Sequence, residues 1–321
     1  MDQRRIRQNP HIRELTSEVV LTHKKLIQPY FVVDGITHKE PISGLTEVYR
    51  ETSESLLRQV ELDMEKGIRK TLLFGVPKAK KSKEFSFDFV CDQISLLKKN
   101  FGKDLFLSVD VCLCSYTESG HCGFVNEEHQ CVDNELSVAT LAEQALQFAQ
   151  AGADCVAPSD MMDGRVKAIR TLLDQQKQSS TLIMSYSAKF HSKFYGPFRL
   201  AADSAPKSQI KDRSTYQIDP SHFNDAFLSS ERDEKEGADI LMVKPGLPYL
   251  DVLFRLSQSI KKPWAVYEVS GEYAAIELLA EKGLISREQA HLEAWTSFFR
   301  AGADMVITYG ARHALDWINK N

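Results

Sequence analysis

The sequence predicts an α/β fold, a closed TIM (β/α)8 barrel that carries an extended N-terminal arm. Short apolar segments alternate eight times with longer segments whose apolar residues recur every three or four positions. The tetrapeptides 151–154, 236–239 and 301–304 all contain Gly-Ala-Asp, and each ends a predicted helix and leads into a predicted strand. The alternative is an open doubly wound sheet, but no G-x-G-x-x-G follows the first strand.

The elements follow from these patterns in chain order. The predicted strands are the short apolar segments Leu26–Val33, Thr71–Val76, Leu105–Leu113, Cys155–Ser159, Leu182–Ser187, Ile240–Pro245, Trp264–Val269 and Met305–Tyr309. The predicted helices are Ser53–Lys66, Asp88–Asn100, Ser137–Ala151, Asp163–Gln178, Asp219–Glu236, Tyr249–Lys261, Ala274–Lys282 and Ser286–Ala301. We therefore expect an N-terminal arm over residues 1–25, and a barrel domain over residues 26–321.

Composition narrows the class of protein. The 321 residues are 43% hydrophobic and 26% charged, which is typical of a globular protein. The net charge of -4 shows no basic excess, so we expect no nucleic-acid partner. Residues 1–9 do not resemble a secretory signal, and no run of 18 apolar residues is present, so we expect no membrane association and a cytoplasmic location.

Three cysteines are candidate metal ligands. Side chains alternate along a strand, so Asp110, Cys112 and Cys114 are expected on the inner face, with Val109, Val111 and Leu113 toward the helices. Cys122 follows in a glycine-containing loop that can fold back over the strand end. Three thiolates with a fourth position open are typical of a catalytic zinc site, whereas His121 or His129 would complete a closed structural one. The remaining alternative is that these cysteines are small buried apolar residues, as we interpret Cys91 and Cys155.

Two lysines are candidate nucleophiles. Lys189 lies just beyond one predicted strand, and Lys244 ends the strand that precedes Pro245. Burial and a second ammonium both depress the pKa of a lysine, which frees its amine to form a Schiff base with a carbonyl. The alternative for each lysine is a solvated or ion-paired surface group. Arg199 and Arg213 in the loop-rich stretch 192–219 are candidates for binding a substrate carboxylate.

The motifs around these residues resemble the porphobilinogen synthase family, also called 5-aminolevulinate dehydratase. The resemblance runs from about Pro29 to Tyr309. It rests on Asp110-Val-Cys-Leu-Cys114, Gly120-His-Cys-Gly123, Ala157-Pro-Ser-Asp-Met-Met-Asp-Gly-Arg165, Met184-Ser-Tyr-Ser-Ala-Lys-Phe190, Phe194-Tyr-Gly-Pro-Phe-Arg199, Met242-Val-Lys-Pro-Gly246 and Val269-Ser-Gly-Glu272.

The resemblance implies a hydro-lyase that condenses two 5-aminolevulinate molecules into porphobilinogen with loss of two waters, an early step of heme and other tetrapyrrole synthesis. It implies a barrel with an N-terminal arm, assembled as a homo-octamer. The family's Schiff-base lysines fall on Lys189 and Lys244, with Lys244 holding the first substrate, and an active-site aspartate falls on Asp110. The remaining positions that carry over are zinc ligands at Cys112, Cys114 and Cys122, second-substrate contacts at Arg199, Arg213 and Gln217, and first-substrate contacts at Ser270 and Tyr309.

Some features stay undecided from the sequence. Asp110 is our hypothesis for the base that takes the final protons, with a zinc-bound hydroxide as the alternative. Thr215 stands near a place where some relatives carry a further cysteine, so the resemblance does not extend to a second zinc site. Some relatives bind an allosteric Mg²⁺ through a glutamate whose place falls near Ser229, two residues from Glu231, which leaves this metal open. The basic segment 78–83 resembles the family's mobile lid, although its charge alone favours a solvated loop.

Two other functions compete with this interpretation. A Schiff-base aldolase is also a barrel with a strand-end lysine, but it needs one lysine and no metal. A non-catalytic zinc protein would use the cysteines to fix a loop, and its lysines would be surface groups.

Overall fold

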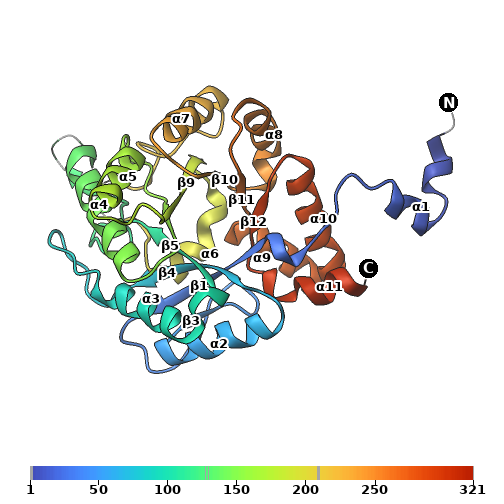
Figure 1. Ribbon diagram of the computed structural model, residues 1–321, viewed down its shortest axis with the longest axis horizontal. Helices are drawn as coiled ribbons and strands as arrows, with labels where there is room; N and C mark the ends of the chain where they lie inside the picture. Colours follow the sequence, from blue (N-terminus) through green and yellow to red (C-terminus); the bar gives the residue numbers. More distant parts are fainter. Residues whose placement is uncertain (1–2, 127, 129, 208–209, 321) are drawn as a thin grey trace.

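Eight parallel strands close into a barrel, as predicted (Figure 1). The structure is a computed structural model that describes residues 3–126, 128, 130–207 and 210–320. Neighbouring strands pair in chain order, and the last pairs with the first. The barrel strands are β1 (Leu26–Val33), β4 (Lys70–Val76), β5 (Phe106–Val111), β8 (Cys155–Pro158), β9 (Leu182–Lys189), β10 (Ile240–Lys244), β11 (Trp264–Tyr267) and β12 (Met305–Ile307).

The eight predicted helices are all present around the barrel. They are α2 (Ser53–Glu65), α3 (Asp88–Phe101), α4 (Asn134–Gln150), α5 (Arg165–Gln175), α7 (Phe223–Lys235), α8 (Leu250–Ser259), α9 (Ser270–Glu281) and α10 (Arg287–Arg300). Helix α9 begins four residues earlier than predicted. Valine is an unusual N-cap residue because its side chain offers no hydrogen-bond acceptor. Here Glu272, inside the helix, supplies the acceptor, since its carboxylate accepts the Val269 N–H at 2.7 Å.

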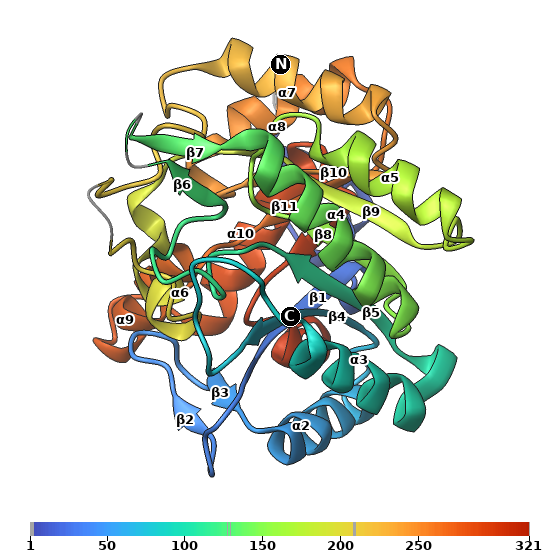
Figure 2. The same cartoon turned by 90° about the vertical axis from the view of Figure 1, so that its left-hand side faces the viewer.

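Short elements that the patterns did not predict lie outside the barrel. They are α1 (Pro10–Leu15), α6 (Gly196–Ala201), α11 (Ala314–Lys320), the pairs β2 (Glu40–Pro41) with β3 (Tyr49–Glu51) and β6 (Phe124–Asn126) with β7 (Cys131–Asp133), and the 3-10 turns Gln3–Arg7, His23–Lys25, Gly102–Asp104, Lys193–Tyr195, Leu247–Tyr249 and Ala311–His313. Figure 2 shows α6 and the β6–β7 hairpin at the same end of the barrel. The described part of the arm reaches away from the barrel and exposes Ile6, Leu15 and Val20 (Figure 1).

The core has two layers because strand side chains alternate between the barrel interior and the surrounding helices. Val109 and Val111 belong to the outer layer, as predicted. Met184 and Met242 belong to the inner layer. The predicted strand 105–113 is too long, however. The Leu113 carbonyl accepts the N–H groups of residues 116 and 117, so the chain turns there and the strand ends at Val111.

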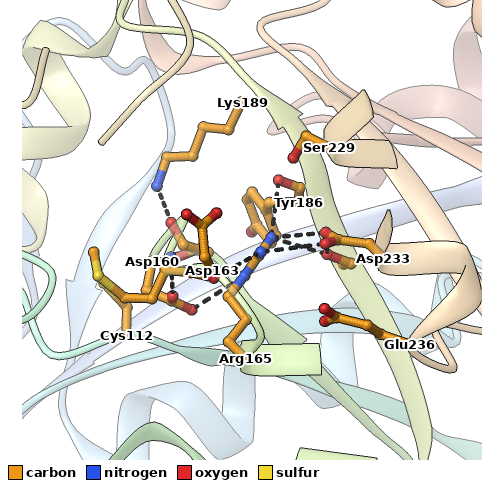
Figure 3. Close-up of polar contacts among 12 residues, drawn as sticks. Cys112, Asp160, Asp163, Arg165, Tyr186, Lys189, Ser229, Asp233 and Glu236 are labelled. Carbon is orange, nitrogen blue, oxygen red and sulfur yellow. Dashed lines mark hydrogen bonds and ion pairs between the residues drawn. The ribbon is translucent and has the colours of Figure 1, made fainter. Parts of the chain in front are cut away.

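A fully buried guanidinium joins four elements behind the strand ends. Arg165, at the start of α5, lies 3.0 Å from the Asp233 carboxylate of α7 and 3.6 Å from that of Asp160, which follows β8. It also donates to the Ser185 hydroxyl of β9 at 3.1 Å. Figure 3 shows this group beside Lys189. A buried cation needs such partners, so Arg165 fixes how β8, β9, α5 and α7 meet.

We predict that Arg165→Met destabilises the protein strongly, because it leaves the buried Asp160 carboxylate without its cation and takes from the buried Asp233 its fully buried partner, leaving Arg232 beside it. The expected loss is about 3–5 kcal/mol of unfolding free energy, measured by denaturant unfolding. The control is Lys98→Met, which removes a partly exposed ion pair of 2.9 Å with Asp154 and should cost at most about 1 kcal/mol. Equal losses in the two variants would contradict this account of Arg165.

Candidate active site

Lys189 and Lys244 lie side by side at the carboxyl ends of neighbouring strands. They are the last residues of β9 and β10, and their Cα atoms are register partners. The prediction that Lys189 lies beyond its strand is wrong by two residues, since β9 continues to Lys189. Both lysines are almost fully buried, at 5% and 4% exposure, so neither is a solvated surface group.

A bulge in β9 turns Lys189 into the barrel. Leu241 pairs with Ser185, but Val243 pairs with Ala188, so β9 contains one extra residue between these pairs. Without it, strict alternation from the inward Met184 would place Lys189 on the helix-facing side. The bulge therefore brings the second amine to the inner face, where Lys244 follows Met242 by ordinary alternation.

The surroundings of Lys244 favour a neutral amine. Burial, followed by the nearby charge of Lys189, lowers the pKa of Lys244 to about 7. This agrees with the predicted loss of basicity. The Lys189 amine donates to the carbonyl oxygen of Ser159, at the end of β8.

Asp110 faces the same interior as the two lysines. Burial raises the pKa of its carboxyl to about 6, while the charges of Lys189 and Lys244 act in the opposite direction. Asp110, Cys112 and Cys114 line one small cavity with Phe198. Asp110 thus lies together with Cys112 and Cys114, as predicted, although the two cysteines lie in the turn after β5.

The three predicted cysteines come together. Their sulfur atoms all lie within 4.8 Å of one another, and all three residues are buried. Hydrogen bonds from the other two thiols lower the pKa of Cys122, whereas burial raises the pKa of Cys112. A divalent cation suits such a set, because it stabilises the thiolate form that burial alone disfavours.

The histidines do not close this cluster within the described part of the chain. One ring nitrogen of His121 contacts the Tyr216 hydroxyl at 3.0 Å, and the other contacts the Ile210 carbonyl at 2.9 Å. His129 lies outside the described residues. The described ligand set is therefore three thiols, which is the number expected for a site with one open coordination position.

Polar atoms without partners mark the predicted second-substrate contacts. The Nε atoms of Arg199 and Arg213 and both amide atoms of Gln217 are buried without a hydrogen-bond partner among the described residues. Burial and the neighbouring Arg213 lower the pKa of Arg199, so the two guanidinium groups lie close enough to repel. Buried polar groups are normally satisfied, so these atoms point to a polar, anionic ligand.

The predicted first-substrate contacts are held by two buried glutamates that the sequence reasoning missed. Besides capping α9 next to Ser270, Glu272 accepts the N–H groups of residues 246 and 247, just after Lys244. Glu268 accepts from the Thr308 hydroxyl, next to Tyr309. The sequence signal that could have revealed them is Glu268 directly after the apolar strand β11, followed by Glu272 four residues later.

The basic segment 78–83 is connected to the loop after α6. The Lys80 amine pairs with the Asp203 carboxylate at 3.0 Å, and Lys207 lies 3.6 Å from the same carboxylate. The segment is therefore not simply a solvated charged loop.

The place near Ser229 considered for an allosteric Mg²⁺ already contains the positively charged side chain of Arg232. The Arg232 guanidinium pairs with Asp163 and donates to the Ser229 hydroxyl at 3.1 Å. Glu231 instead pairs with Lys235 at 3.2 Å along the same helix. A cavity of about 440 Å³ lies beside Arg232 and is also lined by Thr215.

No helix in the described ranges is long and apolar enough to span a bilayer.

Comparisons with known proteins agree with this geometry. The family described as Delta-aminolevulinic acid dehydratase matches residues 1–317. The enzyme of that name from Methanothermus sociabilis is 43% identical over 319 residues, covering 98% of each chain. The Helicobacter pylori (strain J99 / ATCC 700824) enzyme is 41% identical over 323 residues, covering 99% of this chain and 98% of the relative. The crystal structure of the Toxoplasma gondii ME49 enzyme with its product porphobilinogen superposes with a TM-score of 0.93 at 42% identity, covering 99% of this chain and 91% of that one.

We predict that the cysteine cluster binds one divalent metal ion per chain. Cys114→Ala should lose this metal, because two thiols leave too few ligands and both ring nitrogens of His121 have other partners. Metal content by elemental analysis of protein dialysed against zinc measures this directly. The control is Cys155→Ala, a buried cysteine elsewhere in the barrel, which should keep its metal. Full metal content in Cys114→Ala would contradict the assignment.

Proposed function

Because the chain belongs to the Delta-aminolevulinic acid dehydratase (porphobilinogen synthase) family and is therefore a porphobilinogen-forming hydro-lyase, we propose that its paired lysines and cysteine cluster carry this reaction. The observation that supports these roles most is the register pairing of Lys189 with Lys244, whose charges both act on Asp110. The aldolase interpretation requires one lysine, and the non-catalytic zinc protein none. A family match over 317 residues sets both alternatives aside.

Lys244 forms the first covalent bond. Its neutral amine attacks the ketone carbon of 5-aminolevulinate, a C–N bond forms, and water leaves as one proton is taken up, which gives an iminium ion. The positive nitrogen makes the adjacent carbons acidic. A pKa of about 7 means that roughly half of this amine is neutral at pH 7.

Lys189 receives the second substrate in the same way, one strand away. Arg199, Arg213 and Gln217 bind the carboxylate of this molecule, which supplies partners for their buried unpaired atoms. Ser270 and Tyr309 bind the carboxylate of the first molecule. Each substrate is thus held at both its ketone and its acid end, which orients the reacting carbons.

Cys112, Cys114 and Cys122 hold zinc, since all three ligands are thiols and relatives with active-site magnesium would need carboxylates. When bound, zinc supplies a Lewis acid that polarises a ketone or binds an amine. Asp110 takes up protons that leave carbon. Its carboxyl has a pKa of about 6, so it is mostly ionised at pH 7 and close enough to that pH to accept and release protons.

The arm provides contacts between subunits of a homo-octamer. This is supported by Ile6, Leu15 and Val20, which are apolar and yet half or more exposed in a lone chain. The free thiols suit the reducing cytoplasm, where a disulfide would not compete with the metal.

The direct test is product formation. Purified protein is incubated with 5-aminolevulinate under reducing conditions, with and without a zinc chelator, and porphobilinogen is followed by its colour reaction. Activity that stops with chelator and returns with zinc supports the metal site. Folded protein that forms no product under any metal or pH condition would overturn the proposal.

We predict that borohydride traps substrate on Lys244 and that the rate of trapping depends on pH. Only the neutral amine attacks, so the rate should fall about tenfold per pH unit below pH 7 and level off above about pH 8. Samples quenched with borohydride at fixed times and analysed by peptide mass spectrometry give this profile. Lys98→Arg, on the outer surface, should leave it unchanged. A rate that keeps rising to pH 10 would mean that Lys244 has an ordinary lysine pKa.

We also propose that this chain does not use an allosteric Mg²⁺ near Ser229, because Arg232 already provides a positive charge to Asp163. We therefore predict that adding Mg²⁺ to the zinc-loaded enzyme changes neither its activity nor its subunit assembly. Arg232→Ala leaves Asp163 without this charge, so the activity of this variant should respond to added Mg²⁺, whereas that of Lys235→Ala on the same helix should not. Several-fold activation of the unmodified enzyme by Mg²⁺ would contradict this proposal.

A further inference from the structure

Four aromatic rings surround the amine of Lys244. The Nζ atom lies 4.1 Å from the ring centroid of Tyr267, 4.9 Å from Tyr186, 5.0 Å from Phe198 and 5.5 Å from Tyr195. A cation within about 6 Å of a ring face is attracted by the negative face of the π-system. We call these four residues the aromatic box. None of them has a role in the chemistry described so far.

The box is held in place by its own contacts. The Tyr195 hydroxyl donates to the main-chain carbonyl of Lys244 at 3.2 Å. The Phe198 ring meets Phe74 edge-on, with centroids 5.2 Å apart. Tyr267 is fully buried on β11, the strand next to Lys244. The rings are therefore in position before any substrate arrives.

The other lysine has different surroundings. Among the described residues, Tyr186 is the one ring near Lys189, at 5.6 Å, and the Lys189 amine also donates to the Ser159 carbonyl. Lys189 thus has an oxygen partner of the kind that an ammonium needs. The Lys244 amine is instead surrounded by four ring faces, and the Asp110 carboxylate is near enough for its charge to act on this amine.

The surroundings of Lys244 stabilise an ammonium and an iminium to different extents. An ammonium is a compact, strongly hydrated charge with three N–H donors, and it loses much when water is removed. An iminium has one N–H, and its charge is shared between nitrogen and carbon, so it is hydrated more weakly. Ring faces attract both ions but offer no strong acceptors. A box of mostly buried rings therefore favours the iminium over the ammonium.

On the basis of the proposed role of Lys244, we propose that the aromatic box is catalytic: it stabilises the iminium at Lys244 through cation–π contacts and so makes this lysine the one that holds the first substrate. The step is balanced as an amine, a ketone and one proton giving an iminium and one water. Fluorine atoms withdraw electron density from a ring face, so they weaken this contact while keeping the ring's shape.

The test replaces Phe198 by phenylalanines with one, two and three ring fluorines in the full-length, zinc-loaded enzyme. The substrate concentration that gives half-maximal borohydride trapping at Lys244 is measured at fixed pH for each protein. It should rise with every added fluorine, reaching about three- to tenfold for three. The matched control places the same residues at Phe31, which is fully buried and packs against Phe198 at 5.6 Å outside the box. No change is expected there.

A second pair of variants removes a whole ring. Tyr267→Phe keeps the ring and loses the hydroxyl, whereas Tyr267→Leu loses the ring, so trapping at Lys244 should fall much more in the leucine variant. The inference is overturned if fluorination at Phe198 has no effect, or has the same effect as at Phe31. Failure of the proposed function would look different, because the unsubstituted protein would then give no adduct at Lys244.

Discussion

The burial of two neighbouring amines is the constraint on which the rest of this site depends. Lys189 and Lys244 are register partners on adjacent parallel strands and are almost inaccessible to water. Two ammonium groups in such a place would repel each other and lack solvation, so at least one must lose its proton. The fold therefore supplies a nucleophilic amine near pH 7 by position alone. The remaining features either keep the lysines in that position or balance their charge.

Several buried polar groups serve the first purpose. The bulge in β9 sets the direction of Lys189, and Arg165 fixes β9 against its neighbours. Glu272 connects the turn after Lys244 to the first turn of α9, where Ser270 lies. These groups come from different parts of the chain and are satisfied only when the barrel is closed. The geometry at the strand ends is thus a property of the whole barrel.

The sequence was sufficient for features that depend on local periodicity. Alternation placed Asp110 with Cys112 and separated them from Val109, and glycine at helix ends located the strands that follow. It could not place Lys189, because a single extra residue reverses every later side chain in a strand, and no pattern of apolar residues marks that position. The start of α9 was mispredicted for a related reason. Val269 at its N-cap has no side-chain acceptor, and the capping carboxylate belongs to Glu272, three residues later. The family resemblance supplied residue roles at Arg199 and Gln217 that periodicity alone does not reveal.

Charge balance explains why so many polar groups gather at one end of the barrel. Lys189, Arg199 and Arg213 bring positive charge, and Asp110 with the three thiols brings negative charge once the thiols ionise. Two thiolates are neutralised by a divalent cation, and the third can be balanced by Arg213, whose charge adds to the hydrogen bonds from the other two thiols that lower the pKa of Cys122. That leaves an excess of positive charge when the substrates are absent. A substrate carboxylate supplies a counter-charge to Arg199 and Arg213, whose guanidinium groups are poorly solvated in the empty site. The preference for a substrate with a carboxylate is in this sense already present in the charges of the protein.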